Sequence, residues 1–266
     1  MHIFDSHCHL DDVSYNRDLS EVVQRARQAG VCGMMVVGID LEGSQKAIAI
    51  AHAHEGLYAS VGLHPHDAAN CDETVLSRLK RLAQDPKVKA WGETGLDFNR
   101  MYAPQQIQEH CFARQLEIGG SLHLPMIFHE RDSGGRFLEI LKSHWGTNAK
   151  GVVHCFSGSQ GELEAYLELG LYIGITGILT IQSRGKDLRD MARFIPADRL
   201  LVETDAPYLT PTPERNKHRR NEPAFVRTVV FRLAEIRQET PENLARITWD
   251  NACRLFGVNS KAIQSS

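Results

Sequence analysis

The feature that most constrains the fold is a repeated alternation of short apolar runs with longer amphipathic stretches. The apolar runs are rich in Val, Ile and Leu and show little polar alternation. Strands buried on both faces of a parallel sheet have this composition. Eight such runs are predicted as strands: residues 3–8, 33–39, 57–63, 88–92, 124–128, 151–156, 171–175 and 200–203.

The stretches between these runs have helical patterns. Helices are predicted at 19–29, 44–54 and 105–118, each followed by glycine, a usual helix stop. Two more are predicted at 224–237 and 241–256; Thr240 caps the second, and Pro241 suits its first turn.

Eight strand–helix units in 266 residues match the size of a (β/α)8 TIM barrel, about 250 residues. A doubly wound open sheet is the competing α/β fold. No linker or low-complexity segment divides the chain. We therefore expect a single barrel domain with extra C-terminal helices over residues 1–258 and a tail at 259–266.

The composition excludes several classes of protein. Of all residues, 42% are hydrophobic and 24% charged, which is ordinary for a globular protein. The net charge of −3 gives no global basic field, so any polyanion must be bound through a local patch or a metal. No apolar run reaches the roughly 18 residues of a membrane helix. The N-terminus lacks a signal-peptide pattern, and the six cysteines include no CxxC pair. We expect a cytoplasmic protein, monomeric and independent of membranes.

Histidines collect at the ends of the predicted strands, where a barrel brings side chains from different strands together. His7 and His9 lie two residues apart at the first strand end, so they share a face while Cys8 points the other way. Two imidazoles on one face can hold a divalent cation, although a chance HxH is the alternative.

Single residues with metal-binding chemistry follow four further strands. Glu93 closes the fourth strand beside glycine, and its two oxygens could bridge two cations or cap the next loop. His129 and His154 end the fifth and sixth strands. A lone histidine there is usually a core residue, but two at equivalent ends favour ligation. Asp205 follows the eighth strand and could ligate metal and accept a proton from bound water, or simply form a turn before proline. Glu203 lies two residues before Asp205 and is predicted on the same face, where it either supports the site or lies deeper in the barrel.

This set exceeds the needs of one tetrahedral ion and fits two divalent ions that share a carboxylate. Two-metal sites suit phosphoester hydrolysis, but they also hydrolyse lactones and C–N bonds. We expect Glu93 and Asp205 to be the catalytic residues. The predicted metal ligands are His7, His9, Glu93, His129, His154 and Asp205.

Cues to the substrate lie just past the strand ends. His64 and His66 follow the third strand, and Arg131 follows His129. A basic run at 215–220, ending in Arg220, could hold phosphates or be a solvated loop. The predicted substrate-binding residues are His64, His66, Arg131 and Arg220. Tyr208 and Phe98 could stack on bases at the rim or serve in packing.

Together these motifs resemble the TatD family of metal-dependent deoxyribonucleases, within the amidohydrolase-like (β/α)8 superfamily. The matching segments run in the family's order from residue 5 to 223. They are Asp5-Ser6-His7-Cys8-His9-Leu10, Gly62-Leu63-His64-Pro65-His66, Gly92-Glu93-Thr94-Gly95-Leu96-Asp97, Gln108…Phe112…Gln115-Leu116, Pro125…His129-Glu130-Arg131-Asp132, His154-Cys155-Phe156-Ser157-Gly158, Glu203-Thr204-Asp205-Ala206-Pro207 and Arg220-Asn221-Glu222-Pro223.

The resemblance implies a barrel that hydrolyses DNA with divalent metals, from the 3′ end of single-stranded or frayed DNA. By this likeness Glu93 bridges two ions among Mg, Mn, Zn or Co. One ion is held with His7, His9 and Asp205, and the other with His129 and His154. Asp205 would orient or deprotonate the attacking water.

Two alternatives remain at this stage. A lactonase, phosphotriesterase or cyclic-amide hydrolase often bridges its metals with a carboxylated lysine on the fourth strand. The nearest candidate, Lys89, is predicted on the face of Glu93 but too deep in the barrel. A non-enzymatic barrel with a structural zinc site is disfavoured, since such sites are usually closed and commonly use cysteine.

Overall fold

The predicted strands form one eight-stranded sheet whose neighbours all pair in parallel, in the order of the chain. The computed structural model describes residues 1–146 and 149–259. A bridge between Cys8 and Ala206 joins the last strand to the first and closes the ring. This order confirms the barrel and excludes the doubly wound sheet. The strands are β1 Ile3–Cys8, β2 Val31–Val37, β3 Leu57–Val61, β4 Val88–Asp97, β5 Met126–Arg131, β6 Gly151–Val153, β7 Tyr172–Ile175 and β8 Leu200–Val202.

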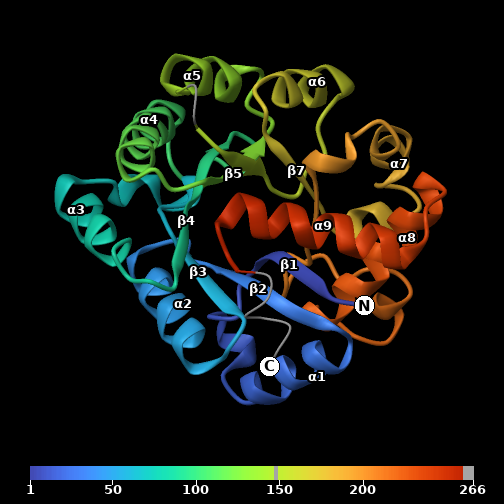
Figure 1. Ribbon diagram of the computed structural model, residues 1–266. Helices are drawn as coiled ribbons and strands as arrows, with labels where there is room; N and C mark the ends of the chain where they lie inside the picture. The colour runs from blue at the N-terminus through green and yellow to red at the C-terminus, as the bar shows by residue number, and fades with distance from the viewer. Residues whose placement is uncertain (147–148, 260–266) are drawn as a thin grey trace.

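Helices surround the strands, as Figure 1 shows in a view with α9 lying across one end of the barrel. None of the helices in the described part of the chain combines the length and apolarity needed to cross a bilayer. The helices are α1 Leu19–Gln28, α2 Leu41–Ala53, α3 Glu73–Leu82, α4 Gln105–Leu122, α5 Arg136–His144, α6 Gln160–Glu168, α7 Lys186–Ala192, α8 Val226–Arg237 and α9 Pro241–Phe256.

The start of α9 and the end of α4 show how well capping and stop residues predict the bounds of a helix. The bounds predicted for α9 are confirmed, and the Thr240 side chain accepts the N–H of Asn243. The predicted stop of α4 at its glycines is wrong. A Cβ on Gly119 would lie 2.2 Å from the Met126 sulfur, so this glycine allows close packing on β5 and the helix continues past it. The left-handed residue that ends α4 is His123, with φ of 56°.

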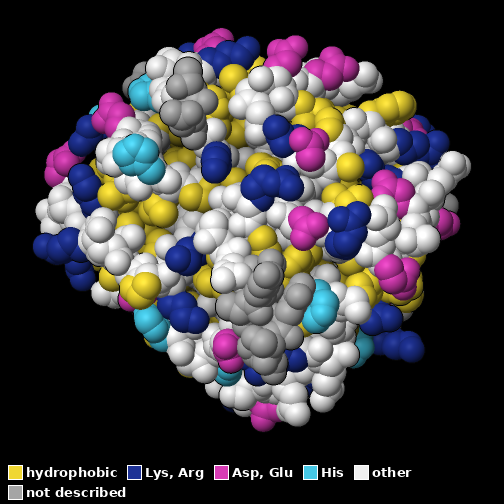
Figure 2. Space-filling view, in the orientation of Figure 1, with side chains coloured by type: hydrophobic (Ala, Val, Ile, Leu, Met, Phe, Trp, Pro, Cys, Tyr) yellow, Lys and Arg dark blue, Asp and Glu magenta, His cyan; other side chains and the backbone are white. Residues whose placement is uncertain are grey.

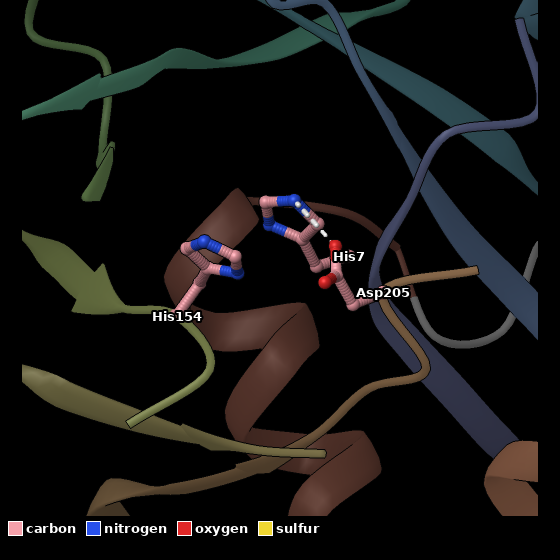
Figure 3. A group of neighbouring side chains, drawn as sticks. All are labelled: His7, His154 and Asp205. Carbon is pink, nitrogen blue, oxygen red and sulfur yellow. Dashed lines mark ion pairs between the residues drawn. The ribbon is translucent and has the colours of Figure 1, made fainter. Parts of the chain in front are cut away.

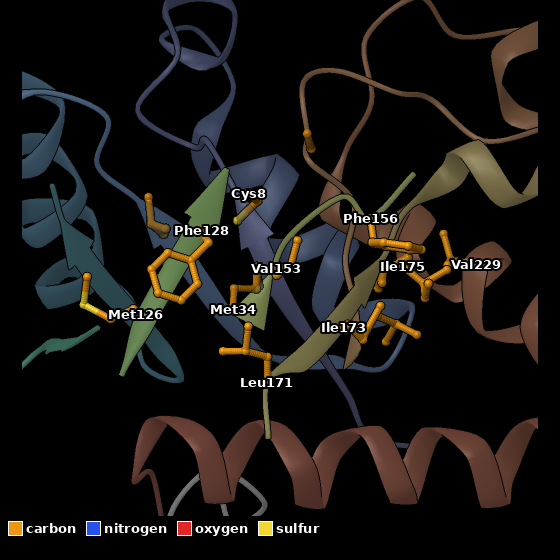
Figure 4. Packing of buried hydrophobic residues seen from close by; sticks show 14 of the residues in the cluster. Cys8, Met34, Met126, Phe128, Val153, Phe156, Leu171, Ile173, Ile175 and Val229 are labelled. Carbon is orange, nitrogen blue, oxygen red and sulfur yellow. The ribbon is translucent and has the colours of Figure 1, made fainter. Parts of the chain in front are cut away.

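Two apolar layers hold the barrel. The outer layer packs between strands and surrounding helices, and Figure 4 shows part of it, including Phe128, Ile173 and Val229. The inner layer fills the barrel and joins α9, which seals the amino end of the strands. Its members include Phe4, Met35, Val37, Ala90, Ile127, Val152, Leu201, Trp249 and Phe256.

Two strands change face partway along their length. On β1 the interior residue Phe4 precedes His7 by three positions, and on β4 Ala90 precedes Glu93 by three. Regular alternation would put the members of each pair on opposite faces. The strand register shifts between Asp5 and Cys8, and again across residues 91–94, so both functional side chains still face the barrel mouth.

The register shift on β4 also corrects the predicted placement of Lys89. This residue does not share the face of Glu93, since its neighbour Ala90 points into the barrel. Lys89 lines a cavity at the amino end of the barrel. The domain boundary after residue 258 stays a prediction, because residues 260–266 of the expected tail lie outside the described residues.

Candidate metal centre at the carboxyl end of the barrel

The carboxylate of Glu93 lies between two pairs of histidines. Its Oε2 is 3.3 Å from His7 Nε2 and 3.9 Å from His9 Nε2. Its Oε1 is 2.9 Å from His129 Nδ1 and 2.8 Å from His154 Nε2. Each oxygen therefore faces a different pair, and the pairs are those expected for two separate ions.

Asp205 adds a second carboxylate beside the first histidine pair. Its Oδ1 is 3.3 Å from His9 Nε2 and 3.8 Å from His7 Nε2. Figure 3 shows His7 between Asp205 and His154, whose ring stacks on that of His7 with centroids 3.9 Å apart. The fold thus brings together all six residues predicted as metal ligands.

The donor atoms of this group fit divalent cations. The Nε2 atoms of His7 and His9 lie 3.2 Å apart, and His129 Nδ1 lies 3.3 Å from His154 Nε2. A neutral imidazole has a lone pair on one nitrogen, so converging ring nitrogens and carboxylate oxygens offer a cation several electron pairs. Among the described residues, three sets of such groups have ligand atoms within 4.8 Å of one another: His7–His154–Asp205, His7–His9–Glu93 and His64–Glu93–His129.

The electrostatics of the centre also favour positive charge. Burial disfavours ionisation of Glu93, but His154, His64 and His7 outweigh it and hold the pKa of the carboxyl well below its usual range. Burial likewise opposes protonation of His9, yet Asp205 and Glu93 raise its pKa to about 9. The carboxylates therefore keep their negative charge inside the protein and attract cations.

His64 lies closer to the centre than expected of a substrate residue. Its Nε2 is 3.4 Å from Glu93 Oε1, and its side chain is buried. Burial lowers the pKa of His64 to about 4, which leaves the ring neutral and able to ligate. The structure thus groups His64 with Glu93 and His129, on the side where the sequence predicted only two histidine ligands.

Asp97 is a member of the site that the sequence analysis missed. Its Oδ2 accepts a hydrogen bond from His66 Nε2 at 2.7 Å and lies 3.3 Å from His129 Nε2. The predicted strand stopped at Gly92, whereas β4 continues to Asp97. The available signal was the spacing from Glu93, because residues 93, 95 and 97 of one strand share a face.

A glycine makes the approach of β4 to β5 possible at this point. Gly95 has φ of +149°, and a Cβ there would lie 1.8 Å from the carbonyl oxygen of His129. No L side chain fits that space without moving the strand that carries His129. Gly95 therefore lets β5, which carries His129, lie close to β4 beside the centre.

Two buried carboxyl groups, those of Glu203 and Asp5, lie next to the centre, just after β8 and within β1 respectively. Glu203 accepts from Ser6 Oγ at 2.9 Å, and its Oε1 lies 3.6 Å from His154 Nδ1. Asp5 accepts from the hydroxyl of Thr204 at 2.6 Å, and burial raises the pKa of Asp5 to about 8. These contacts tie the ends of β1 and β8 together and place the Glu203 carboxylate beside His154.

The predicted substrate residues take different positions around the mouth. His66 is partly exposed and held by Asp97, and Arg131 is exposed at the end of β5. Arg220 pairs with Asp18 at 2.6 Å and with Glu222 at 3.1 Å, which fastens the loop after β8 to the start of α1. This is a structural role, and substrate contact by these residues stays a prediction.

Of the two aromatic residues considered for base stacking, Phe98 packs against the outer core, whereas Tyr208 is exposed at the rim. Residues 215–219 of the basic run are exposed, as both interpretations of that loop require.

Comparisons with known proteins agree with this geometry. A model of the family described as TatD related DNase matches residues 4–257. A "3'-5' ssDNA/RNA exonuclease TatD" from Rahnella sp. (strain Y9602) is 44% identical over 262 residues, covering 97% of this chain and all of the relative.

Solved structures agree as well. A TatD homologue from Escherichia coli K12 superposes with a TM-score of 0.89 at 32% identity, covering 97% of this chain and 98% of the homologue. A TatD family hydrolase from Entamoeba histolytica superposes with a TM-score of 0.87 at 26% identity, covering 96% and 98% of the two chains.

Proposed function

Because the chain belongs to the TatD related DNase family, we propose that it removes nucleotides from the 3′ end of single-stranded DNA or RNA. The family makes it a metal-dependent hydrolase of nucleic-acid phosphodiester bonds. The observation that carries the proposal is the pairing of each Glu93 oxygen with a different set of histidines. That arrangement supports two ions with one bridging carboxylate.

We assign one ion to His7, His9 and Asp205 and the other to His64, His129 and His154, with Glu93 between them. His64 is added to the set expected from the sequence. Divalent ions in such a site polarise phosphoryl oxygens and lower the pKa of bound water. Mg, Mn, Zn and Co all accept ligands of this kind.

The protein's own groups then orient the reacting atoms. Asp205 is the least buried carboxylate of the centre, with 14% of its side chain exposed, so it can meet an incoming water. Asp205 accepts a proton from that water as the water oxygen attacks the phosphorus and the bond from phosphorus to the sugar oxygen breaks; the leaving sugar oxygen takes a proton from bulk water. His66 and Arg131 at the rim bind the phosphate oxygens and stabilise the charge that develops on them.

The rival hydrolases are not favoured. A carboxylated lysine on the fourth strand needs a lysine facing the centre, whereas Glu93 occupies that place and Lys89 faces away from it. We also propose a cytoplasmic location, which the six free cysteines support, and a monomer.

The proposal is tested with single-stranded DNA and RNA oligonucleotides, labelled at the 5′ end, in a time course with Mg²⁺ or Mn²⁺. We expect stepwise shortening from the 3′ end, no cleavage in EDTA, and protection by a blocked 3′ end. The Glu93→Gln protein should lose activity by about 10³-fold, the scale of losing a major electrostatic element of a catalytic site.

Glu130→Gln is the matched control. Glu130 adjoins His129 on the same strand, but its carboxylate accepts from Ser133 at 2.7 Å. This variant should keep wild-type activity. Failure of well-folded, metal-loaded protein to shorten any oligonucleotide, or equal rates for Glu93→Gln and wild type, would overturn the proposal and direct the assay to lactones and phosphotriesters.

A further inference from the structure

Two tyrosine side chains are exposed beside the metal centre. Tyr102, in the loop after β4, is 66% exposed, and Tyr208, in the loop after β8, is 54% exposed. Each ring meets a histidine of the site edge to face. Tyr102 lies 4.6 Å from His66 and Tyr208 lies 6.0 Å from His9, measured between ring centroids.

The two tyrosines stand at the ends of a continuous series of rings across the mouth. From Tyr208 the series passes through His9 to His7 at 4.9 Å, and from His7 to His154 at 3.9 Å. It continues to His129 at 5.5 Å, then to His66 at 6.1 Å and to Tyr102. The metal-ligating groups therefore lie between the two exposed rings.

The topology explains this placement. Strands β4 and β8 are four positions apart in a ring of eight, so the loops that follow them rise from opposite sides of the mouth. The Tyr208 loop is held in place because the Asn221 side chain donates to the Tyr208 carbonyl at 2.6 Å and to that of Thr204 at 3.0 Å. The Tyr208 ring is thus presented on an ordered backbone and remains open to solvent.

We propose that Tyr102 and Tyr208 are two nucleobase-binding subsites, one on each side of the scissile phosphate. The inference rests on the proposed function and extends it to the recognition of the substrate. When the terminal linkage lies at the metal centre, its two flanking nucleotides extend toward opposite rims, where each base stacks on one tyrosine. A flat aromatic ring accepts any base, because every base has a π-face.

Such subsites would favour single strands over a duplex. Bases inside a duplex are already stacked on their neighbours, so their faces are not available to either tyrosine. The last two nucleotides of a single strand can separate at little cost. The two subsites therefore select unpaired ends without reading the sequence.

The experiment compares Tyr102→Ala and Tyr208→Ala with the wild type on three oligonucleotides of equal length. One is intact, one has an abasic 3′-terminal nucleotide, and one has an abasic penultimate nucleotide. On the intact strand we expect each substitution to raise KM by roughly 10-fold, the scale of one base–aromatic stack, with little change in kcat. Each Phe variant should keep the wild-type KM, since the ring is retained.

The abasic strands separate base binding from a merely structural effect. The penalty of one tyrosine variant should vanish on the strand with the abasic terminal nucleotide, and that of the other variant on the strand with the abasic penultimate nucleotide. Phe194→Ala is the control: its ring is 78% exposed on the connection from α7 to β8, and this variant should match wild type on all strands. Thermal unfolding checks that every variant is folded.

The outcomes distinguish failure of the proposed nuclease function from failure of the two base-binding subsites. If wild-type protein does not cleave the intact strand, the proposed function fails. If it cleaves that strand but both tyrosine variants keep the wild-type KM, only this inference fails. The inference also fails if the penalties persist on both abasic strands, or if both map to the same nucleotide.

Discussion

The two ends of the barrel are built from the same strands but from opposite kinds of residue. At the amino end, Phe4 of β1 packs against Trp249 and Phe256 of α9, with ring centroids 6.0 and 5.9 Å apart. At the carboxyl end, β1 supplies His7 to a cluster of imidazoles and carboxylates. Apolar burial at one end stabilises the fold, which allows the other end to hold charged groups at a cost in stability.

The ends also differ in where their charged groups lie. A cavity of about 990 Å³ at the amino end has Lys89, Lys150 and Arg254 among its lining residues. Figure 2 views the face that α9 crosses, where Lys, Arg, Asp and Glu side chains stand among apolar patches. The carboxyl end instead concentrates buried carboxylates such as Glu93 and Asp97. These buried carboxylates attract divalent cations to the carboxyl end.

The largest effect is expected at the carboxyl end, where a substitution should lower the catalytic rate and leave the stability of the fold nearly unchanged. Asp205→Asn should lower kcat by about 10³-fold, because an amide cannot accept the proton of the attacking water. Rates with saturating metal check this, and thermal unfolding should be nearly unchanged. Asp132→Asn is the matched control, since Asp132 lies at the same rim and has the same φ of 56°. An equal loss of kcat in both variants would show that Asp205 is not the group that accepts the proton of the attacking water.

The reverse result is expected at the amino end. Trp249→Ala should lower the free energy of unfolding by about 3–5 kcal/mol, as large aromatic truncations in cores do. Denaturant unfolding measures this loss, and kcat of the folded protein should not change. Trp249→Phe should cost much less, because the buried indole Nε1 has no hydrogen-bond partner among the described residues. A large fall in kcat for either variant would show that the amino end also contributes to catalysis.

A smaller effect is expected from Asp97, which positions a ligand. Asp97→Asn should weaken metal affinity by about 10–100-fold, the usual cost of losing the group that orients a ligating histidine. Titration calorimetry of the metal-free protein gives the affinity directly. Asp67→Asn, one residue after His66, should bind metal like wild type. Unchanged affinity in Asp97→Asn would show that His129 is oriented by Glu93 and the strand alone.

The smallest effect concerns the ionic rim that joins the loop after β8 to α1. Arg220 and Arg25 hold the pKa of Asp18 at about 2, below its unfolded value of about 3.9. A lowered pKa in the folded state stabilises the protein above about pH 4, and this contribution is lost as the pH falls toward 2. Asp18→Asn should cost about 1 kcal/mol at pH 7, as exposed pairs do.

Denaturant unfolding at several pH values tests the ionic rim. The difference in stability between wild type and Asp18→Asn should shrink from pH 5 to pH 3 and with added salt. Glu42→Gln is the control, because the exposed Glu42–Lys46 pair lies on the surface of α2. A difference that stays constant with pH would mean that Asp18 acts through packing and not through its charge.

Much of the barrel could be predicted because its signals are local. Each strand contains a short apolar run, and all eight were found, with most bounds within two residues of those observed. The clearest errors come from glycine. Gly119 allows α4 to pack on Met126, and Gly95 lets β4 continue past its predicted end. A glycine has the same local signature whether it ends an element or makes room for a neighbour.

The six residues expected as ligands lie together, as their positions at strand ends predicted, since the ends of parallel strands meet in a barrel. His64 was assigned to substrate, because the sequence does not reveal that its ring turns toward Glu93. Asp97 was missed since the strand was predicted to end too early, and Tyr102 since loop residues carry no periodic signal.

The sequence by itself determined the order of strands and helices and the kinds of side chain at each strand end, because these depend on composition and local spacing. Only the tertiary structure decided which face those side chains take. In β1 and β4 the strand register shifts between the interior residue and the predicted ligand, so Phe4 and His7, and likewise Ala90 and Glu93, all point into the barrel. Such a shift depends on pairing with neighbouring strands, and alternation along a single strand cannot reveal it.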